Sequence, residues 1–299
     1  MTISLASMEV FPSTSAAIGE SPVFHNEELV WVDAEGCRIY RAAVGKPGNP
    51  DIVEHTVPVP VSAIACAGEN GWILVCKNGL YHCDRVFGSL LPLGNPVSRT
   101  SELRLNDCKV SPSGDLWFGS MNGSDLEAPD GEIFILHRKT LKIEKVDAGF
   151  AVSNGISFDA VRRRVYITNM FRRQVFVYEL EQDFRTVRSK KVFLELTEQQ
   201  GYPDGLKTDS KGNLYVCHWE AGLISVWSPD GQCLQQLKLP VKHATRCTFG
   251  GPVLQDLYVT SGSYEMSDDE KRAQPLSGLT LRLNNSIPGV GDGVFGSGR

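Results

Sequence analysis

The stretch Gly212-Asn-Leu-Tyr-Val-Cys217 decides the fold, because variants of it recur along the chain. Each copy is an alternating run of aliphatic, aromatic and β-branched residues next to a turn, which is typical of a strand. The other copies are Glu28-Leu-Val-Trp-Val-Asp33, Gly71-Trp-Ile-Leu-Val-Cys76, Gly114-Asp-Leu-Trp-Phe-Gly119, Arg164-Val-Tyr-Ile-Thr168 and Gln255-Asp-Leu-Tyr-Val-Thr260. Their central aliphatic residues are 43, 43, 49, 49 and 43 positions apart, so the chain contains a repeat.

A second alternating run follows several copies after a loop, as in Gly131-Glu-Ile-Phe-Ile-Leu136 and Gln174-Val-Phe-Val-Tyr178. Each unit therefore holds at least one hairpin and has room for two more strands. Periods of about 40 to 50 residues with around four strands per unit are typical of β-propeller blades. A β-sandwich would need seven to nine strands in about 100 residues and would not repeat in this way. We therefore predict an all-β, six-bladed β-propeller in which the run 278–283 shares a blade with the N-terminal segment and closes the ring.

The repeat also bears on domain organisation. Length alone leaves one or two domains open, since all-β domains of roughly 200 to 250 residues occur. Six repeat units predict that residues 1–299 form a single domain. The glycine-rich run Gly289-Val-Gly-Asp-Gly293 cannot open a dinucleotide-binding helix, because only six residues follow it. We predict that residues from about 285 to 299 form a loose C-terminal tail.

The charge balance and the apolar pattern exclude several classes of protein. With 30 Lys and Arg against 35 Asp and Glu, the formal charge is −5, which argues against binding to a nucleic-acid backbone. The first basic residue is Arg38, so no basic region precedes a signal-peptide core, and no apolar run approaches the 18 or so residues of a membrane span. We expect a cytoplasmic protein, monomeric or weakly homo-oligomeric, with neither nucleic acid nor membrane as a partner.

The eight cysteines are scattered and contain no Cys-x-x-Cys pair for a redox or zinc site. Most lie beside strand-like residues, as in Ile73-Leu-Val-Cys76. In an intracellular protein this pattern favours free thiols in the core over disulfides.

Four polar segments stand at equivalent points of the repeat, and we place them just before the innermost strand of their blades. They are Gly19-Glu-Ser-Pro22, Arg104-Leu-Asn-Asp107, Ser153-Asn-Gly155 and Tyr202-Pro-Asp-Gly205. Such segments converge on the central channel of a propeller, and carboxylate and amide oxygens suit Ca²⁺, Mg²⁺ or Mn²⁺. A single Asn-Gly or Asp-Gly is more often a hairpin turn, but four equivalent groups favour a site. Lipase-type, zincin and P-loop motifs are absent from the sequence.

At these residues the chain resembles the regucalcin/gluconolactonase family of sugar-lactone hydrolases over nearly its whole length. The resemblance extends from the polar segments into Ser111-Pro-Ser-Gly-Asp-Leu-Trp-Phe-Gly-Ser-Met121 and Leu239-Pro-Val-Lys-His-Ala-Thr-Arg-Cys-Thr-Phe-Gly-Gly251. It implies a six-bladed propeller with one divalent cation, Ca²⁺, Zn²⁺, Mn²⁺ or Mg²⁺, in a central metal-binding channel. By motif match the resemblance implies that the metal ligands are Glu20, Asn154 and Asp204, and that the sugar contacts are Arg104 and Asn106.

One departure from the family pattern concerns the substrate. Family members often carry an acidic substrate contact a few residues after the Met of the third blade, where this chain has Met121-Asn-Gly-Ser-Asp125. We expect the acidic substrate contact to be made by Asp125 or Glu127, or to be missing from this chain.

The resemblance implies a carboxylic ester hydrolase of carbohydrate metabolism, which opens an aldonolactone such as a glucono- or arabinonolactone to the aldonic acid. The metal would act as a Lewis acid on the lactone carbonyl and Asp204 as general base. Two alternatives stay open: a phosphotriester hydrolase on the same scaffold, and a calcium-binding propeller without activity. His218 and Trp219 either reach the channel mouth or pack against each other, Trp31 either walls a sugar pocket or belongs to the core, and Tyr202 is a further candidate for the pocket entrance.

Overall fold

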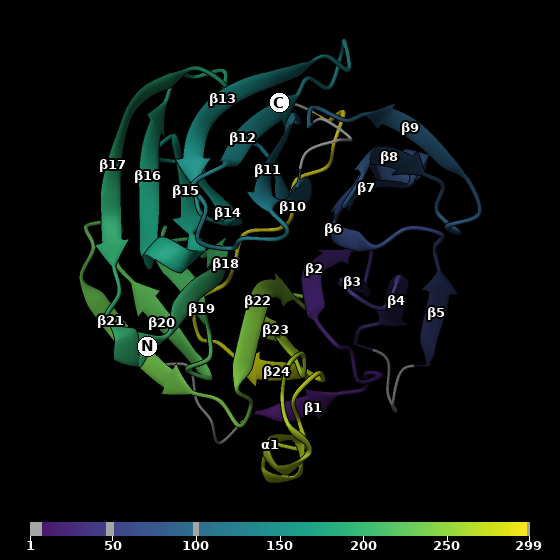
Figure 1. Cartoon of the computed structure of the whole chain (residues 1–299), viewed down its shortest axis with the longest axis vertical. Coiled ribbons are helices and arrows are strands. Elements are labelled where there is room, and N and C mark those ends of the chain that lie inside the picture. Colours follow the sequence, from purple (N-terminus) through teal and green to yellow (C-terminus); the bar gives the residue numbers. More distant parts are fainter. Residues whose placement is uncertain (1–7, 46–50, 98–101, 298–299) are drawn as a thin grey trace.

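The computed structural model describes residues 8–45, 51–97 and 102–297. It is a ring of six four-stranded antiparallel sheets around a central channel (Figure 1). The predicted all-β, six-bladed β-propeller is therefore confirmed. Within the described ranges, no helix is long and apolar enough to cross a membrane.

Each sheet is one blade, and in the first five blades the strands run in chain order from the channel outward. The first three blades are β2 (Gly19–His25), β3 (Glu28–Asp33), β4 (Arg38–Ala43) and β5 (Ile52–Thr56); β6 (Val61–Cys66), β7 (Trp72–Cys76), β8 (Gly79–Cys83) and β9 (Leu90–Gly94); and β10 (Leu103–Val110), β11 (Leu116–Asn122), β12 (Gly131–Leu136) and β13 (Ile143–Phe150). The next two are β14 (Ser153–Asp159), β15 (Arg164–Asn169), β16 (Gln174–Leu180) and β17 (Val187–Glu195); and β18 (Tyr202–Thr208), β19 (Leu214–Trp219), β20 (Leu223–Trp227) and β21 (Cys233–Lys238).

The sixth blade is built from both ends of the chain. It consists of β22 (His243–Gly250), β23 (Asp256–Gly262), β24 (Thr280–Asn284) and, outermost, β1 (Glu9–Phe11). Strand β1 pairs with β24 in antiparallel register, with Val10 opposite Leu281, so the predicted ring closure is confirmed. The helices are short: α1 (Asp268–Ala273) lies between β23 and β24, and η2 (Gly68–Asn70), η3 (Met170–Arg172) and η4 (Glu198–Gln200) are single 3₁₀ turns.

The hydrophobic core lies between the blades. Each pair of neighbouring blades encloses its own cluster of buried apolar side chains. Between the third and fourth blades, for example, Trp117 packs edge-on against Phe158 with ring centroids 5.8 Å apart. A central strand contacts neighbours on both faces, which explains why it is a nearly continuous apolar run.

The repeated sequence stretches correspond to the second strand of each blade, namely β3, β7, β11, β15, β19 and β23. The prediction that the polar segments precede the innermost strand was wrong, because these segments lie within the innermost strands themselves. The inner strands carry more polar residues than the second strands, since they line the channel.

All six innermost strands contain an irregularity at an equivalent point. The register shifts occur between Glu20 and Val23, Val61 and Ala63, Leu105 and Cys108, Asn154 and Ile156, Pro203 and Leu206, and Ala244 and Cys247. A β-bulge takes residues out of the hydrogen-bonded ladder and redirects their side chains. Asn106, Asp204 and Arg246 occupy such unpaired positions, and Glu20 and Asn154 directly precede one.

The prediction of a loose C-terminal tail was wrong for the described residues up to 297. This segment, yellow in Figure 1, crosses the middle of the ring. Gly289 bridges to Asp209 and Val294 bridges to Cys66. Its glycines allow close packing: a Cβ on Gly289 would lie 1.9 Å from the Phe249 ring.

Asp292 holds this C-terminal segment in place. Its side chain is 5% exposed and forms ion pairs with Lys109 and, at 2.6 Å, with Lys207. It also accepts hydrogen bonds from the Phe24 amide at 3.2 Å and the Thr248 hydroxyl at 2.9 Å. One carboxylate thus joins the inner strands of four blades, β2, β10, β18 and β22.

The cysteines follow the expected pattern. All eight are free, and six of them are buried, which confirms the prediction that most are core residues. Cys37 is partly buried and Cys233 is exposed.

Candidate metal and substrate site

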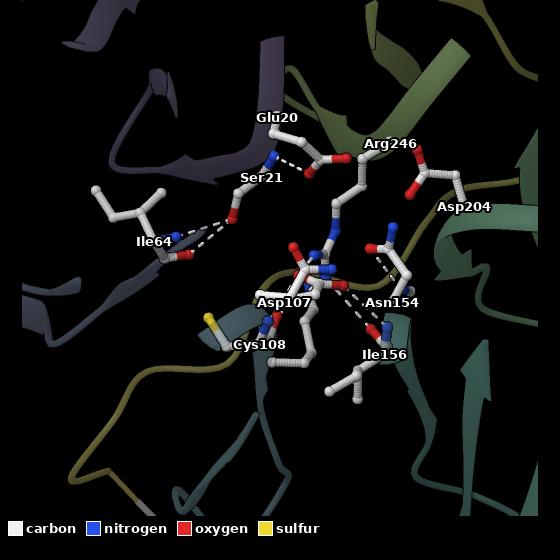
Figure 2. A network of polar contacts seen from close by, with 12 residues as sticks. Glu20, Ser21, Ile64, Asp107, Cys108, Asn154, Ile156, Asp204 and Arg246 are labelled. Carbon is white, nitrogen blue, oxygen red and sulfur yellow. Dashed lines mark hydrogen bonds and ion pairs between the residues drawn. The ribbon is translucent and has the colours of Figure 1, made fainter. Parts of the chain in front are cut away.

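The three predicted metal ligands come from three different blades. Glu20 lies on β2, Asn154 on β14 and Asp204 on β18. Figure 2 shows the two carboxylates and the amide directed toward one space in the channel. The structure therefore brings together residues that are up to 184 positions apart in the sequence.

Two carboxylate oxygens at this space have no hydrogen-bond partner among the residues that the structure describes. One oxygen of Glu20, Oε2, accepts a hydrogen bond from the Ser21 amide at 2.5 Å, but the buried Oε1 has no partner. The buried Oδ1 of Asp204 has none either. The Asn154 side-chain nitrogen lies 3.5 Å from the Met170 sulfur, and the side-chain oxygen of Asn154 accepts a hydrogen bond from the adjacent Gly155 amide at 3.1 Å.

The electrostatics of the two acids fit a bound cation. Burial raises the pKa of Glu20 to about 7, although the charge of Arg246 opposes the shift. Burial, and then the charge of Glu20, raise the pKa of Asp204 well above its usual range. Two buried carboxylates with unpartnered oxygens are costly unless a cation lies between them. Two carboxylates and an amide oxygen are a hard donor set that suits a divalent cation.

Two glycines show why Asn-Gly and Asp-Gly are not hairpin turns here. A Cβ on Gly155, whose φ is +22°, would lie 2.1 Å from the Asp204 carbonyl oxygen. A Cβ on Gly205 would lie 2.4 Å from the Arg246 side chain. Glycine is required because neighbouring inner strands approach closely at the channel.

The predicted sugar contacts lie on β10. Asn106 donates a hydrogen bond from its side chain to the Ser153 carbonyl at 3.0 Å, which leaves its amide oxygen available. Arg104 is partly buried and forms no ion pair with any residue of the described ranges. Burial lowers the pKa of the Arg104 guanidinium, while the negative charge of Glu35 opposes the shift. Arg104 is therefore an available cation with little neutralisation by its neighbours.

The acidic substrate contact stays a prediction. Asp125 and Glu127 are exposed in the loop between β11 and β12. The Asp125 carboxylate accepts a hydrogen bond from the Glu127 amide at 3.0 Å, within the same loop. The Glu127 carbonyl accepts one from Arg172 at 2.9 Å.

His218 and Trp31 have structural environments. His218 lies on β19, is fully buried, and its ring nitrogens lie 2.7 Å from the Gln200 carbonyl and 2.6 Å from the Ser225 hydroxyl. Trp31 stacks on Tyr40 in the core between the sixth and first blades, with ring centroids 5.4 Å apart. Neither residue walls the channel.

Tyr202 and Trp219 occupy an apolar group beside the predicted ligands. They pack against a buried cluster of Met121, Val152 and Met170. The Trp219 ring lies 3.9 Å from that of His243, and the Arg173 guanidinium lies 4.3 Å from the Tyr202 ring centroid. Tyr202 thus remains a candidate for the pocket entrance.

The buried His218 gives a pH-dependent prediction. Burial lowers its pKa from 6.5 to about 4, so the unfolded chain takes up its proton first as the pH falls. His218 therefore contributes stability above pH 6.5 that is lost progressively toward pH 4. Replacing His218 with Gln should lower the free energy of unfolding by about 1–3 kcal/mol at pH 7.5, through two lost hydrogen bonds. Urea unfolding at several pH values should show this difference shrinking below pH 6.5; a constant difference would contradict it.

The sequence interpretation missed two residues of the channel. Asp107 and Arg246 stand within the quoted motifs but were given no role. They form a buried ion pair, 4% and 2% exposed. A charged residue inside an otherwise buried strand, such as Arg246 in β22, was the signal available in the sequence.

Fold and site together define a six-bladed β-propeller with an oxygen-donor site in its central channel. The chain belongs to the SMP-30/gluconolactonase/LRE-like family, whose model matches residues 18–263. The resemblance inferred from the motifs is thereby confirmed.

Individual relatives span almost the whole chain. The pentonolactonase XacC of Haloferax volcanii is 29% identical over 290 residues, covering 92% of this chain and 94% of that protein. Regucalcin of Xenopus laevis is 28% identical over 298 residues, covering 96% and 98%. The crystal structure of a calcium-binding protein, regucalcin, from Agrobacterium tumefaciens shares the fold with a TM-score of 0.90 at 24% identity, covering 97% of both chains.

Proposed function

We propose that this protein is a metal-dependent lactonase that hydrolyses a sugar lactone, such as a glucono- or arabinonolactone, to the aldonic acid. The observation that carries the proposal is the group of unpartnered oxygens of Glu20 and Asp204 beside the Asn154 amide. The name of the pentonolactonase relative supports the substrate class. One divalent cation, Ca²⁺, Zn²⁺, Mn²⁺ or Mg²⁺, would be held by Glu20, Asn154 and Asp204.

The residues of this chain would divide the work as follows. A bound divalent cation supplies Lewis acidity at the lactone carbonyl. Asp204 accepts a proton from the attacking water, because one oxygen of its carboxylate can hold the cation while the other takes the proton. The ring C–O bond then breaks, and the proton accepted by Asp204 passes to the departing ring oxygen, which becomes a hydroxyl of the aldonic acid. Arg104 and Asn106 orient the sugar hydroxyls, and the positive charge of Arg104 favours the developing oxyanion.

An assay panel tests the proposal directly. D-Glucono-lactone, L-arabinono-lactone and a phosphotriester are offered in parallel, with and without chelator. We expect acid release from a lactone, its loss with chelator and its recovery with added divalent cation. Turnover of the phosphotriester alone, or metal-linked stabilisation without any turnover, would contradict the proposal.

Arg104 should contribute mainly to substrate binding. Replacing Arg104 with Gln is expected to raise KM for sugar lactones about tenfold and to change kcat less, because hydrogen bonds to the sugar form in both ground and transition states. Steady-state kinetics measure the split, and an unaltered KM would reject Arg104 as a substrate contact. Replacing Arg188 with Gln, which is exposed on the outermost strand of the fourth blade, is the matched control.

A further inference from the structure

Arg246 crosses the central channel. It starts from the bulge of β22 in the sixth blade, and its guanidinium reaches β10 in the third blade, on the opposite side of the ring. It forms an ion pair with Asp107 and donates hydrogen bonds to the Cys108 carbonyl at 3.1 Å and the Ile156 carbonyl at 3.4 Å. Figure 2 shows this side chain running from between Glu20 and Asp204 to Asp107.

Asp107 is a third buried carboxylate of the channel, and its polar contacts are satisfied. Its Oδ1 accepts from Arg246 and from the Cys108 amide at 2.6 Å, and its Oδ2 accepts from the Ile156 amide at 3.3 Å. These contacts contrast with the unpartnered oxygens of Glu20 and Asp204. Without Arg246, Asp107 would be a buried anion with no counter-charge.

The charges divide the channel into two zones. The first zone contains three carboxylates and one guanidinium, those of Glu20, Asp204, Asp107 and Arg246. Their charges sum to −2, which one divalent cation neutralises. In the second zone, two lysines, Lys109 and Lys207, face the single carboxylate of Asp292. A cavity of about 10 Å³, room for about one water molecule, is lined by Arg246 together with Lys109 and Asp292.

We propose that Arg246 is a fixed cation that takes the place of a second metal ion. It neutralises Asp107 and thereby limits the channel to one divalent cation, held by Glu20, Asn154 and Asp204. The proposal rests on the metal site of the proposed function. A positive charge held this close also limits the affinity for the bound cation, because like charges repel strongly where water is excluded. Arg246 therefore sets both the number of cations and how tightly the site holds them.

Metal titration of the full chain tests the proposal independently of turnover. Isothermal titration with Mn²⁺ and with Ca²⁺ should give one equivalent for the unaltered protein. Replacing Arg246 with Met removes the counter-charge of Asp107 and should raise the stoichiometry to two cations per chain. The double replacement of Arg246 with Met and Asp107 with Asn removes both charges and should return the stoichiometry to one. Arg246→Lys keeps the positive charge and should also bind one cation.

A second variant keeps the proposal testable if Arg246→Met fails to fold. Asp107→Asn leaves the Arg246 charge without its partner, so the Kd for the single cation should rise at least about tenfold. One equivalent for folded Arg246→Met, or an unchanged Kd for Asp107→Asn, would overturn the role of Arg246 and leave the lactonase proposal standing. Absence of any binding by the unaltered protein would contradict the metal site itself.

Discussion

Replacing Asp204 with Asn is expected to reduce kcat/KM for sugar lactones by about a hundredfold to ten-thousandfold, the range in which a general base contributes. The replacement removes a proton acceptor and one charge of the metal site while keeping the shape of the side chain. Stabilisation of the protein by added divalent cation should fall with it. The measurements are steady-state kinetics and thermal melts with and without metal.

The metal-free stability of this variant separates a role in the site from a role in the fold. Asp204 is 3% exposed and its Oδ1 has no partner in the described part of the chain, so loss of its charge should leave the metal-free melting temperature unchanged or raise it. Asp209, which directly follows the strand that carries Asp204, offers the matched control. Its carboxylate accepts hydrogen bonds from Lys211 and Asn213, so Asp209→Asn should lower stability and spare kcat/KM. Retained turnover in Asp204→Asn would remove its assigned role.

Replacing Asp292 with Ala should have the largest effect on stability, a loss of about 3–5 kcal/mol in the free energy of unfolding. The change leaves Lys207, 3% exposed, and Lys109, 12% exposed, without their shared counter-charge. It also breaks the only carboxylate contact that the described structure gives between the C-terminal segment and the inner strands. Urea unfolding monitored by tryptophan fluorescence measures the loss.

The pH dependence and a compensating variant test the electrostatic cause. Burial alone would raise the pKa of Asp292, but the charges of Lys109 and then Lys207 outweigh it and hold the pKa well below its usual range. The contribution of Asp292 is therefore complete at neutral pH and declines only as the pH falls below the unfolded value of about 3.8. Adding Lys207→Met and Lys109→Met to Asp292→Ala should recover much of the lost stability, and no recovery would point to packing instead.

The repeat could be predicted from the sequence because the second strand of each blade contacts neighbouring blades on both faces. The residues of this strand, such as Leu214 and Val216, must be apolar at nearly every position. The repeat can therefore be recognised from a single sequence. The inner strands leave a weaker pattern, since bulges interrupt their alternation and channel residues are polar. The interpretation therefore mistook the second strand for the innermost one.

The candidate ligands could be predicted from the sequence because family motifs surround them. The residues that contact one another around these ligands could not be predicted. Nothing local in the sequence places Arg246 against Asp107, which lies 139 positions away. The C-terminal glycines posed a related difficulty. Glycine permits flexibility and close packing equally, and only the position of Phe249 against Gly289 shows which of the two applies.

The pairing of β1 with β24 has a consequence for how the protein is made. Arg282 and Glu9, which form an ion pair at 2.6 Å, are 273 positions apart, so the sixth blade cannot assemble until almost the whole chain has left the ribosome. Until then β1 has no partner, and the growing arc of blades ends in an uncovered apolar face. Contacts between such distant segments form slowly. The protein should consequently depend on chaperones during synthesis more than a helical protein of equal length, and a nascent chain released before β24 should aggregate.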